Sequence, residues 1–252
     1  MTRLEHGVTD PLFRFWTGVS QVMNRIAEWV MTFAPIGVFG LVAEAFARAG
    51  TAAAAPLMAF AAVVLAALAA HALLTLPALL VVVGRVSPLA LYRAVGPAVF
   101  TAFSAASSSA ALPVTMGCMV RNAGVSNRVS SFVLPLGAAV NMNGTALYEC
   151  VAAVFLAQAY GLDLDLSTQF IILAIAVVSC VGLPGIPLAS LVAIAVILSA
   201  IGLPSEAIGA LVVFDRVLDM VRTSINVLGD TVCAVLVARL EGEATTLALL
   251  EG

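Results

Sequence analysis

The sequence contains no lysine and few charges of any kind. All eleven basic residues are arginine, charged residues make up 10% of the chain, and the formal net charge is -3. A nucleic-acid-binding protein would show a basic run or a clear excess of positive charge. We therefore expect no nucleic-acid partner.

Cysteine and histidine are also scarce. The four cysteines lie at least 30 residues apart in apolar surroundings, and the two histidines have no partner pattern. This spacing matches neither a zinc site nor a disulfide framework. We interpret the cysteines as small buried hydrophobic residues.

Hydrophobic residues, in contrast, make up 62% of the chain, and the mean hydropathy is +1.13. These values lie outside the range of soluble globular domains. Residues 54–83 carry no charge and are long enough to cross a bilayer with some tilt. The sequence therefore predicts a polytopic integral membrane protein whose surroundings are a lipid bilayer.

Two further apolar stretches do not behave like ordinary spans. Residues 91–120 are interrupted by Ser107–Pro113, and residues 170–203 are interrupted by Gly182–Pro187. As one straight helix the second stretch would be about 50 Å long, against a hydrocarbon core of about 30 Å. Two helical hairpins that enter and leave by the same face fit both lengths. Their tips would lie at membrane depth, where exposed backbone is tolerated beside a cavity or ligand.

Between these stretches, residues 129–160 form one span with a polar break at Asn141–Thr145. Such a break frees backbone carbonyls that can coordinate a cation. The predicted fold is all-α and polytopic, with transmembrane helices and two re-entrant hairpins flanking a broken helix as an inverted repeat. The predicted segments are a peripheral segment with a scaffold-type helix (1–53), a transmembrane helix (54–90), hairpin 1 (91–128), the broken helix (129–160), hairpin 2 (167–203), a polar-striped helix (205–240) and a tail (241–252).

The arginines predict the orientation. With a cytoplasmic C-terminus, Arg48 alone among the loop arginines falls outside, and the loop of residues 160–169 contains aspartates but no arginine. This asymmetry satisfies the positive-inside rule. We expect a bacterial-type inner-membrane protein with its C-terminus in the cytoplasm.

The last apolar segment carries an unusual set of polar residues. At about 100° per residue they fall within one stripe of a helix. The stripe consists of Asp215, Asp219, Arg222, Thr223, Asn226 and Asp230. Charges at membrane depth are costly and mark a binding site or an ion path.

Several motifs, in this order and spacing, resemble the glutamate/aspartate transporters, also described as dicarboxylate/amino acid:cation symporters. These motifs are Ala34–Phe39, Ser107–Met116, Leu134–Ala138, Asn141–Tyr148, Gly185–Pro187, Asp219–Thr223 and Gly229–Asp230. The resemblance implies a transport core that moves as a block against a trimeric scaffold, with sodium ions as coupling ions and no organic cofactor. The N-terminal scaffold spans of the family are largely missing from this chain. No enzymatic chemistry is expected.

The resemblance also implies roles for individual residues. Asp219 would bind the amino group of an acidic amino acid, and Arg222 its side-chain carboxylate. The implied substrate-binding residues are Ser107, Ser108, Ser109, Thr145, Ile186, Asp219, Arg222, Thr223 and Asn226. The implied ligands of one sodium ion are Gly137, Asn141, Asn226 and Asp230, and those of a second are Ala139, Cys180, Val181 and Leu183. Asp215 receives no role.

Departures from the family pattern keep alternatives open. The family usually has Asp at the position of Asn143, and that carboxylate belongs to a third cation site. Its replacement by Asn argues against three coupled sodium ions and favours two cations or partial proton coupling. A dicarboxylate transporter, a truncated non-transporting fragment and, remotely, an intramembrane aspartyl protease stay as rivals. Asp219 and Arg222 could also form a structural ion pair. The serine run could serve helix packing, and the break at residues 141–145 could be a plain kink.

Overall fold

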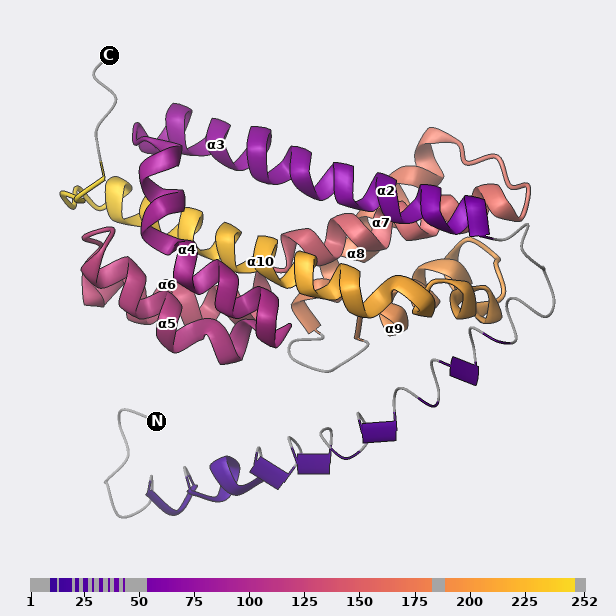
Figure 1. Cartoon of the computed structure of the whole chain (residues 1–252), viewed down its shortest axis with the longest axis horizontal. Helices are drawn as coiled ribbons and strands as arrows, with labels where there is room; N and C mark the ends of the chain where they lie inside the picture. The colour runs from indigo at the N-terminus through magenta and orange to yellow at the C-terminus, as the bar shows by residue number, and fades with distance from the viewer. Residues whose placement is uncertain are drawn as a thin grey trace.

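The described part of the chain consists of helices and the connections between them (Figure 1). The computed structural model describes residues 54–182 and 189–247, together with helical positions scattered between residues 10 and 43. Leu183, Ile186 and the predicted tip Gly185–Pro187 lie outside the described residues, as does Pro35.

The first long rod is made of four consecutive helical pieces. Helix α2 (Ala54–Ala70) continues into a π-helical turn η2 (His71–Thr75), a short α3 (Leu76–Leu79) and a second π-helical turn η3 (Leu80–Gly84). The wide turns flank Pro77, which has no backbone N–H to donate. The hydroxyl of Tyr92 donates a hydrogen bond to the Ala72 carbonyl. The rod ends at Arg85, whose φ of 51° reverses the chain.

Helices α4 (Pro88–Ala105) and α5 (Ser108–Arg121) follow and pack against each other. A serine begins each helix: the Ser87 hydroxyl accepts a hydrogen bond from the Ala90 amide, and the Ser107 hydroxyl from the Ala110 amide. Such caps satisfy amide groups that the first turn leaves free. Between the two helices, Ala106 has a φ of 47°. The chain therefore turns sharply at the serine run.

Helices α6 (Asn127–Val140) and α7 (Asn143–Ala159) are separated only by Asn141 and Met142. Within residues 127–159 the structure thus has a helix that is interrupted in its middle. Helices α8 (Leu166–Gly182) and α9 (Ala189–Ala200) pack against each other and against α7. A short η4 (Ser205–Ala210) leads into the longest helix, α10 (Val212–Leu240).

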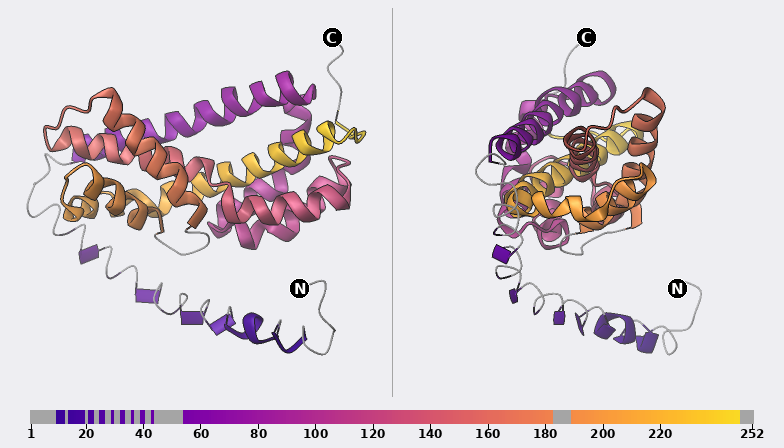
Figure 2. Two further views of the ribbon diagram at one scale, coloured as in Figure 1. Left: turned by 180° about the vertical axis from the view of Figure 1, so that it is seen from behind. Right: turned by 90° about the vertical axis from the view of Figure 1, so that its right-hand side faces the viewer.

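Helix α10 runs through the centre of this assembly (Figure 2). It contacts α2, α4, α5, α6 and α7. Three stretches of the described residues are long and apolar enough to cross a membrane: Ala55–Gly84, Asn127–Ala159 and Phe214–Leu240. In the third, 72% of the most apolar window lies inside the protein, against 33% in each of the others. The helix with the polar stripe is thus the most buried of the three.

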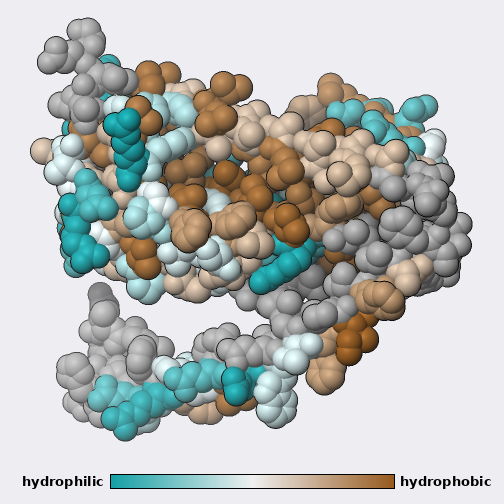
Figure 3. Space-filling model, viewed as in Figure 1, coloured by the Kyte–Doolittle hydropathy of each residue, from teal (hydrophilic) through white to brown (hydrophobic). Residues whose placement is uncertain are grey.

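The outer surface agrees with a membrane environment. In Figure 3 apolar residues cover much of the middle of the elongated body, and hydrophilic residues gather toward its ends. Large apolar side chains on several helices are exposed, including Leu74 on η2, Phe132 on α6 and Val178 on α8. Lipid can cover such side chains, whereas their exposure to water would be energetically unfavourable.

Candidate functional site

The polar stripe of α10 faces the interior of the protein. Asp215, Arg222 and Asp230 are buried, as are Thr223 and Asn226. The Asp219 side chain differs, because 30% of it is exposed. The helical period that predicted one stripe therefore places its charges where neighbouring helices surround them.

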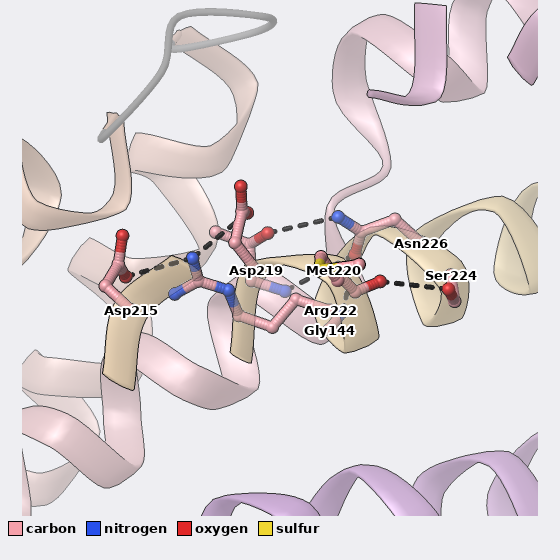
Figure 4. Close-up of polar contacts among 8 residues, drawn as sticks. Gly144, Asp215, Asp219, Met220, Arg222, Ser224 and Asn226 are labelled. Carbon is pink, nitrogen blue, oxygen red and sulfur yellow. Dashed lines mark hydrogen bonds and ion pairs between the residues drawn. The ribbon is translucent and has the colours of Figure 1, made fainter. Parts of the chain in front are cut away.

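Arg222 lies between two carboxylates (Figure 4). Its Nη2 donates to Asp215 Oδ1 at 3.1 Å and to Asp219 Oδ1 at 3.0 Å. The guanidinium carbon lies 3.9 Å from the centre of the Tyr148 ring, which is a cation–π contact. The Arg222 Nε and Nη1 are buried without a hydrogen-bond partner among the described residues. One nitrogen thus bonds both carboxylates, and the other two guanidinium nitrogens have no recorded partner within residues 54–182 and 189–247.

The broken helix contacts this stripe at Asn226. The Asn226 side-chain oxygen accepts hydrogen bonds from the amides of Gly144 at 2.8 Å and Thr145 at 3.3 Å. Its amide nitrogen donates to the Thr145 hydroxyl at 3.0 Å. A Cβ added to Gly144 would lie 2.9 Å from the Arg222 carbonyl oxygen, so only glycine permits this close approach. A side chain of α10 therefore accepts the hydrogen bonds of two backbone amides in the first turn of α7.

Three of the four residues predicted for the first sodium site lie close together, namely Asp230, Asn141 and Gly137. The Asp230 Oδ1 accepts a hydrogen bond from the Asn141 side-chain amide at 2.8 Å. A Cβ added to Gly137 would lie only 2.5 Å from the same oxygen. Gly137 is in the last turn of α6, so the Asp230 carboxylate lies against the end of that helix. Asn226, the fourth predicted ligand, is one turn away on α10.

The other predicted site residues have no recorded hydrogen bond to the α10 stripe or to one another among the described residues. Ser107 caps α5, and Ser108 and Ser109 begin that helix, but the structure records no hydrogen bond from these serines to the α10 stripe. Of the second sodium set, Cys180 is buried and Val181 is exposed on α8, whereas Ala139 lies on α6. No hydrogen bond joins Ala139 to α8 in the described residues. Leu183 and Ile186 belong to the residues that the structure does not describe.

Glu149 is a buried carboxylate that the sequence predictions did not include. It is 1% exposed, and its Oε2 accepts a hydrogen bond from the Ser179 hydroxyl at 3.1 Å. The Cys180 thiol lies 3.9 Å from the same oxygen. The sequence contains a signal for this residue, because an acidic residue inside an apolar span marks a functional position. Tyr148, which stacks on Arg222, lies within a predicted motif but received no predicted role.

The fold and this cluster define a class: an integral membrane protein with membrane-spanning helices around buried charged side chains. The family model "Sodium:dicarboxylate symporter family" matches residues 1–240, and the chain belongs to that family. This match confirms the family that the sequence motifs indicated. The family is one of transporters, so the protein is not an enzyme, and the aspartyl protease alternative is excluded.

Three curated relatives illustrate the similarity. The chain is 39% identical over 227 residues to an excitatory amino acid transporter of Caenorhabditis elegans, covering 88% of this chain and 45% of the relative. It is 39% identical over 228 residues to excitatory amino acid transporter 3 of Mus musculus, covering 87% and 42%. It is 36% identical over 235 residues to excitatory amino acid transporter 1 of Rattus norvegicus, covering 91% and 42%. The chain thus spans less than half the length of these relatives.

Proposed function

We propose that this chain carries an acidic amino acid, glutamate or aspartate, across the membrane together with sodium ions. The observation that supports this most is the buried Arg222, whose Nε and Nη1 have no hydrogen-bond partner in the part of the chain that the structure describes. Arginine stays charged at any physiological pH, and hydrogen bonds from it to a carboxylate are charge-assisted. A substrate carboxylate could accept such a hydrogen bond from Nη1 or from Nε, which lie on different edges of the guanidinium.

Asp219 favours an amino acid over a simple dicarboxylate. Its carboxylate is the most exposed charge of the stripe and accepts a hydrogen bond from Arg222 Nη2 at 3.0 Å. A substrate ammonium group could therefore reach it, whereas a dicarboxylate would bring only negative charge there. Thr145, Thr223 and Asn226 would support the bound substrate. Asp215 would hold Arg222 from the side away from Asp219 and is its second recorded ion-pair partner.

The first sodium site gains support from electrostatics. The C-terminal end of α6 carries partial negative charge on its carbonyls, and the Asp230 carboxylate lies against it at Gly137. The donor recorded for Asp230 is the neutral Asn141 amide. Two negative groups in contact are stabilised by a cation, and a hard cation such as sodium prefers oxygen ligands. The second site would use Ala139, Cys180, Val181 and Leu183.

The movement would follow from the two packed helix pairs. We assign α4 with α5, and α8 with α9, as re-entrant hairpins, the first of which has its tip at Ser107–Ser109. The substrate and ions would cross with the hairpins as one block, in an elevator-type motion. A trimeric scaffold and a cytoplasmic C-terminus in a bacterial-type inner membrane belong to the same proposal.

Binding of labelled aspartate to the purified full chain in lipid nanodiscs, with sodium or choline as the cation, tests the assignment. We expect sodium-dependent binding that Arg222→Gln abolishes. Arg216→Gln provides a matched control, because Arg216 is exposed on the same helix outside the stripe. Undiminished sodium-dependent binding in Arg222→Gln would disprove the role of this residue.

Proton coupling is a second candidate, supported by Glu149. This carboxyl is buried in α7, and its recorded partners are the neutral side chains Ser179 and Cys180. Buried carboxyl groups of this kind can carry a proton across a membrane. If Glu149 does so, Glu149→Gln will remove the pH dependence of net uptake into proteoliposomes and leave sodium-dependent exchange intact. Unchanged pH dependence in the variant would reject this coupling.

A further inference from the structure

An apolar groove of about 600 Å³ lies between α2 and α7, separate from the α10 stripe. One side is a stripe on α2 from Pro56 to Val63, and the other is a stripe on α7 from Cys150 to Gln158. Lining residues recur every three or four positions on both helices, so the groove follows the two helix axes. At 1.5 Å per residue, its length is about 12 Å.

The groove is apolar along most of this length and polar at one end. Among the described lining residues Gln158 alone carries a side-chain amide, and it lies two residues before α7 ends at the connection that starts with Tyr160. The opposite wall starts at Pro56, in the first turn of α2. The groove therefore begins at the helix ends, where the headgroups of a bilayer would lie, and runs toward the centre of the membrane.

The floor of the groove leads to Arg222. Phe60 is 2% exposed, and its ring lies 4.9 Å from the Phe155 ring and 6.0 Å from the Tyr148 ring, measured between centroids. Tyr148 in turn stacks under the Arg222 guanidinium at 3.9 Å. Contacts between aromatic rings thus connect the groove to the cation of the α10 stripe.

We propose that the groove holds one acyl chain of a membrane lipid, and that this chain fixes the Tyr148 ring under Arg222 through Phe60. Val63, which lines the groove on α2, is 54% exposed to the surroundings of the protein, so hydrocarbon is the solvent at this position. One leaflet of the hydrocarbon core is about 15 Å deep, which matches an acyl chain lying along a groove of about 12 Å.

The aspartates that follow α7 favour a headgroup that carries a cation. The connection after α7, residues 160–165, contains Asp163 and Asp165 and no basic residue. An anionic headgroup would be repelled there, whereas a zwitterionic headgroup presents a cation to the aspartates. The ligand is therefore the acyl chain of a zwitterionic phospholipid.

Photocrosslinking tests the site without any transport activity. The full chain is placed in nanodiscs with a phosphatidylcholine that carries a diazirine in one acyl chain, and labelled peptides are identified by mass spectrometry. We expect labelling of the groove walls on α2 and α7 above that of other exposed helices. Val63→Trp fills the groove from its exposed rim and should reduce this labelling to the background, whereas Val192→Trp on exposed α9 should not.

Two outcomes overturn the lipid site. One is labelling that is uniform over all exposed apolar helices or insensitive to Val63→Trp. The other is a crosslink between the groove and a protein segment, when a benzophenone is attached at Val63→Cys, which would show that a helix occupies the groove.

The coupling to Arg222 rests on the proposed function and is tested separately. Sodium-dependent aspartate affinity is compared in nanodiscs for the wild type and for Phe60→Ala, which removes the ring that connects the groove to Tyr148. We expect the affinity to fall about tenfold, a typical coupling between two sites. Val63→Trp, whose ring replaces the acyl chain above Phe60, should retain the wild-type affinity. Equal affinity in Phe60→Ala and the wild type contradicts the coupling but not the lipid site, and absence of aspartate binding in the wild type contradicts the proposed function alone.

Discussion

The contact between the broken helix and α10 can be tested by adding one methyl group. In Gly144→Ala the new Cβ would lie 2.9 Å from the Arg222 carbonyl oxygen, 3.2 Å from Asn226 Oδ1 and 3.2 Å from the Ile225 Cβ. The first of these atoms belongs to the backbone of a buried helix and cannot rotate away. The first turn of α7 must therefore shift from α10, and the 2.8 Å hydrogen bond from the Gly144 amide to Asn226 lengthens.

The magnitude follows from two contributions. Overpacking of a well-packed contact costs about 1–3 kcal/mol. Loss of a buried hydrogen bond adds about 1 kcal/mol. We expect the free energy of unfolding to fall by about 3 kcal/mol, which lowers the unfolding midpoint by roughly 10 °C. Substrate affinity should fall as well, because Asn226 and Thr145 belong to the proposed site.

Gly117→Ala is the matched control. Its Cβ would lie even closer to a neighbour, 2.6 Å from Arg121 Nη2, but this atom is the end of a flexible, exposed side chain. The side chain can rotate away, and alanine gains up to about 1 kcal/mol over glycine within a helix. Thermal unfolding of both purified variants, followed by aspartate binding, is the assay. Equal stability and equal binding in the two variants would show that α7 is not held against Arg222 and Asn226 as the structure describes.

Three further perturbations have distinct outcomes. Gly137→Ala places a Cβ 2.5 Å from Asp230 Oδ1 and should raise the half-saturating sodium concentration of aspartate binding about tenfold, equivalent to about 1.4 kcal/mol; an unchanged sodium titration would reject Asp230 as a ligand. Asp215→Asn removes one of the two recorded carboxylate partners of Arg222 and should lower the free energy of unfolding by about 2 kcal/mol, the value of one hydrogen bond to a charged group, measured by thermal unfolding; wild-type stability would contradict this. Hydrogen bonds from the serine before α6 lower the pKa of Glu243, so their stabilisation is complete above its ordinary pKa of 4.5 and is lost as the pH falls through the lowered value. The unfolding midpoint of Glu243→Gln should therefore fall less steeply with acidification than that of the wild type, and identical slopes would refute this.

The stripe on α10 illustrates what a sequence can predict. Its members follow the helical period, so they lie on one face of the helix. Apolar residues cover the remaining faces, which predicts that the polar face turns toward the interior of the protein. The break after Val140 could also be expected, because Asn141 and Gly144 are unusual within a span. Both features depend on neighbours along the chain, which the sequence records directly.

Contacts between distant segments could not be predicted from the residues alone. Asn226 bonds Thr145 across 81 residues, and no local pattern specifies that pair. The sharing of Arg222 Nη2 between Asp215 and Asp219 depends on which rotamers the surrounding helices permit. Glu149 was missed for a different reason. A single acid among apolar residues has no periodic companions, although its cost at membrane depth is itself a signal.

The spacing of charges along α10 explains why substrate and cations would bind together. Arg222, Asn226 and Asp230 follow one another at intervals of one turn, so the two proposed sites are about 12 Å apart on one rigid helix. The stripe carries three carboxylates and one guanidinium, hence a net charge of -2 before any ligand binds. An acidic amino acid adds a further negative charge, which a low-dielectric interior strongly disfavours. Two sodium ions would leave the loaded stripe with less negative charge than the empty one. Substrate affinity should therefore depend on cation occupancy through charge alone, without a conformational change that connects the sites.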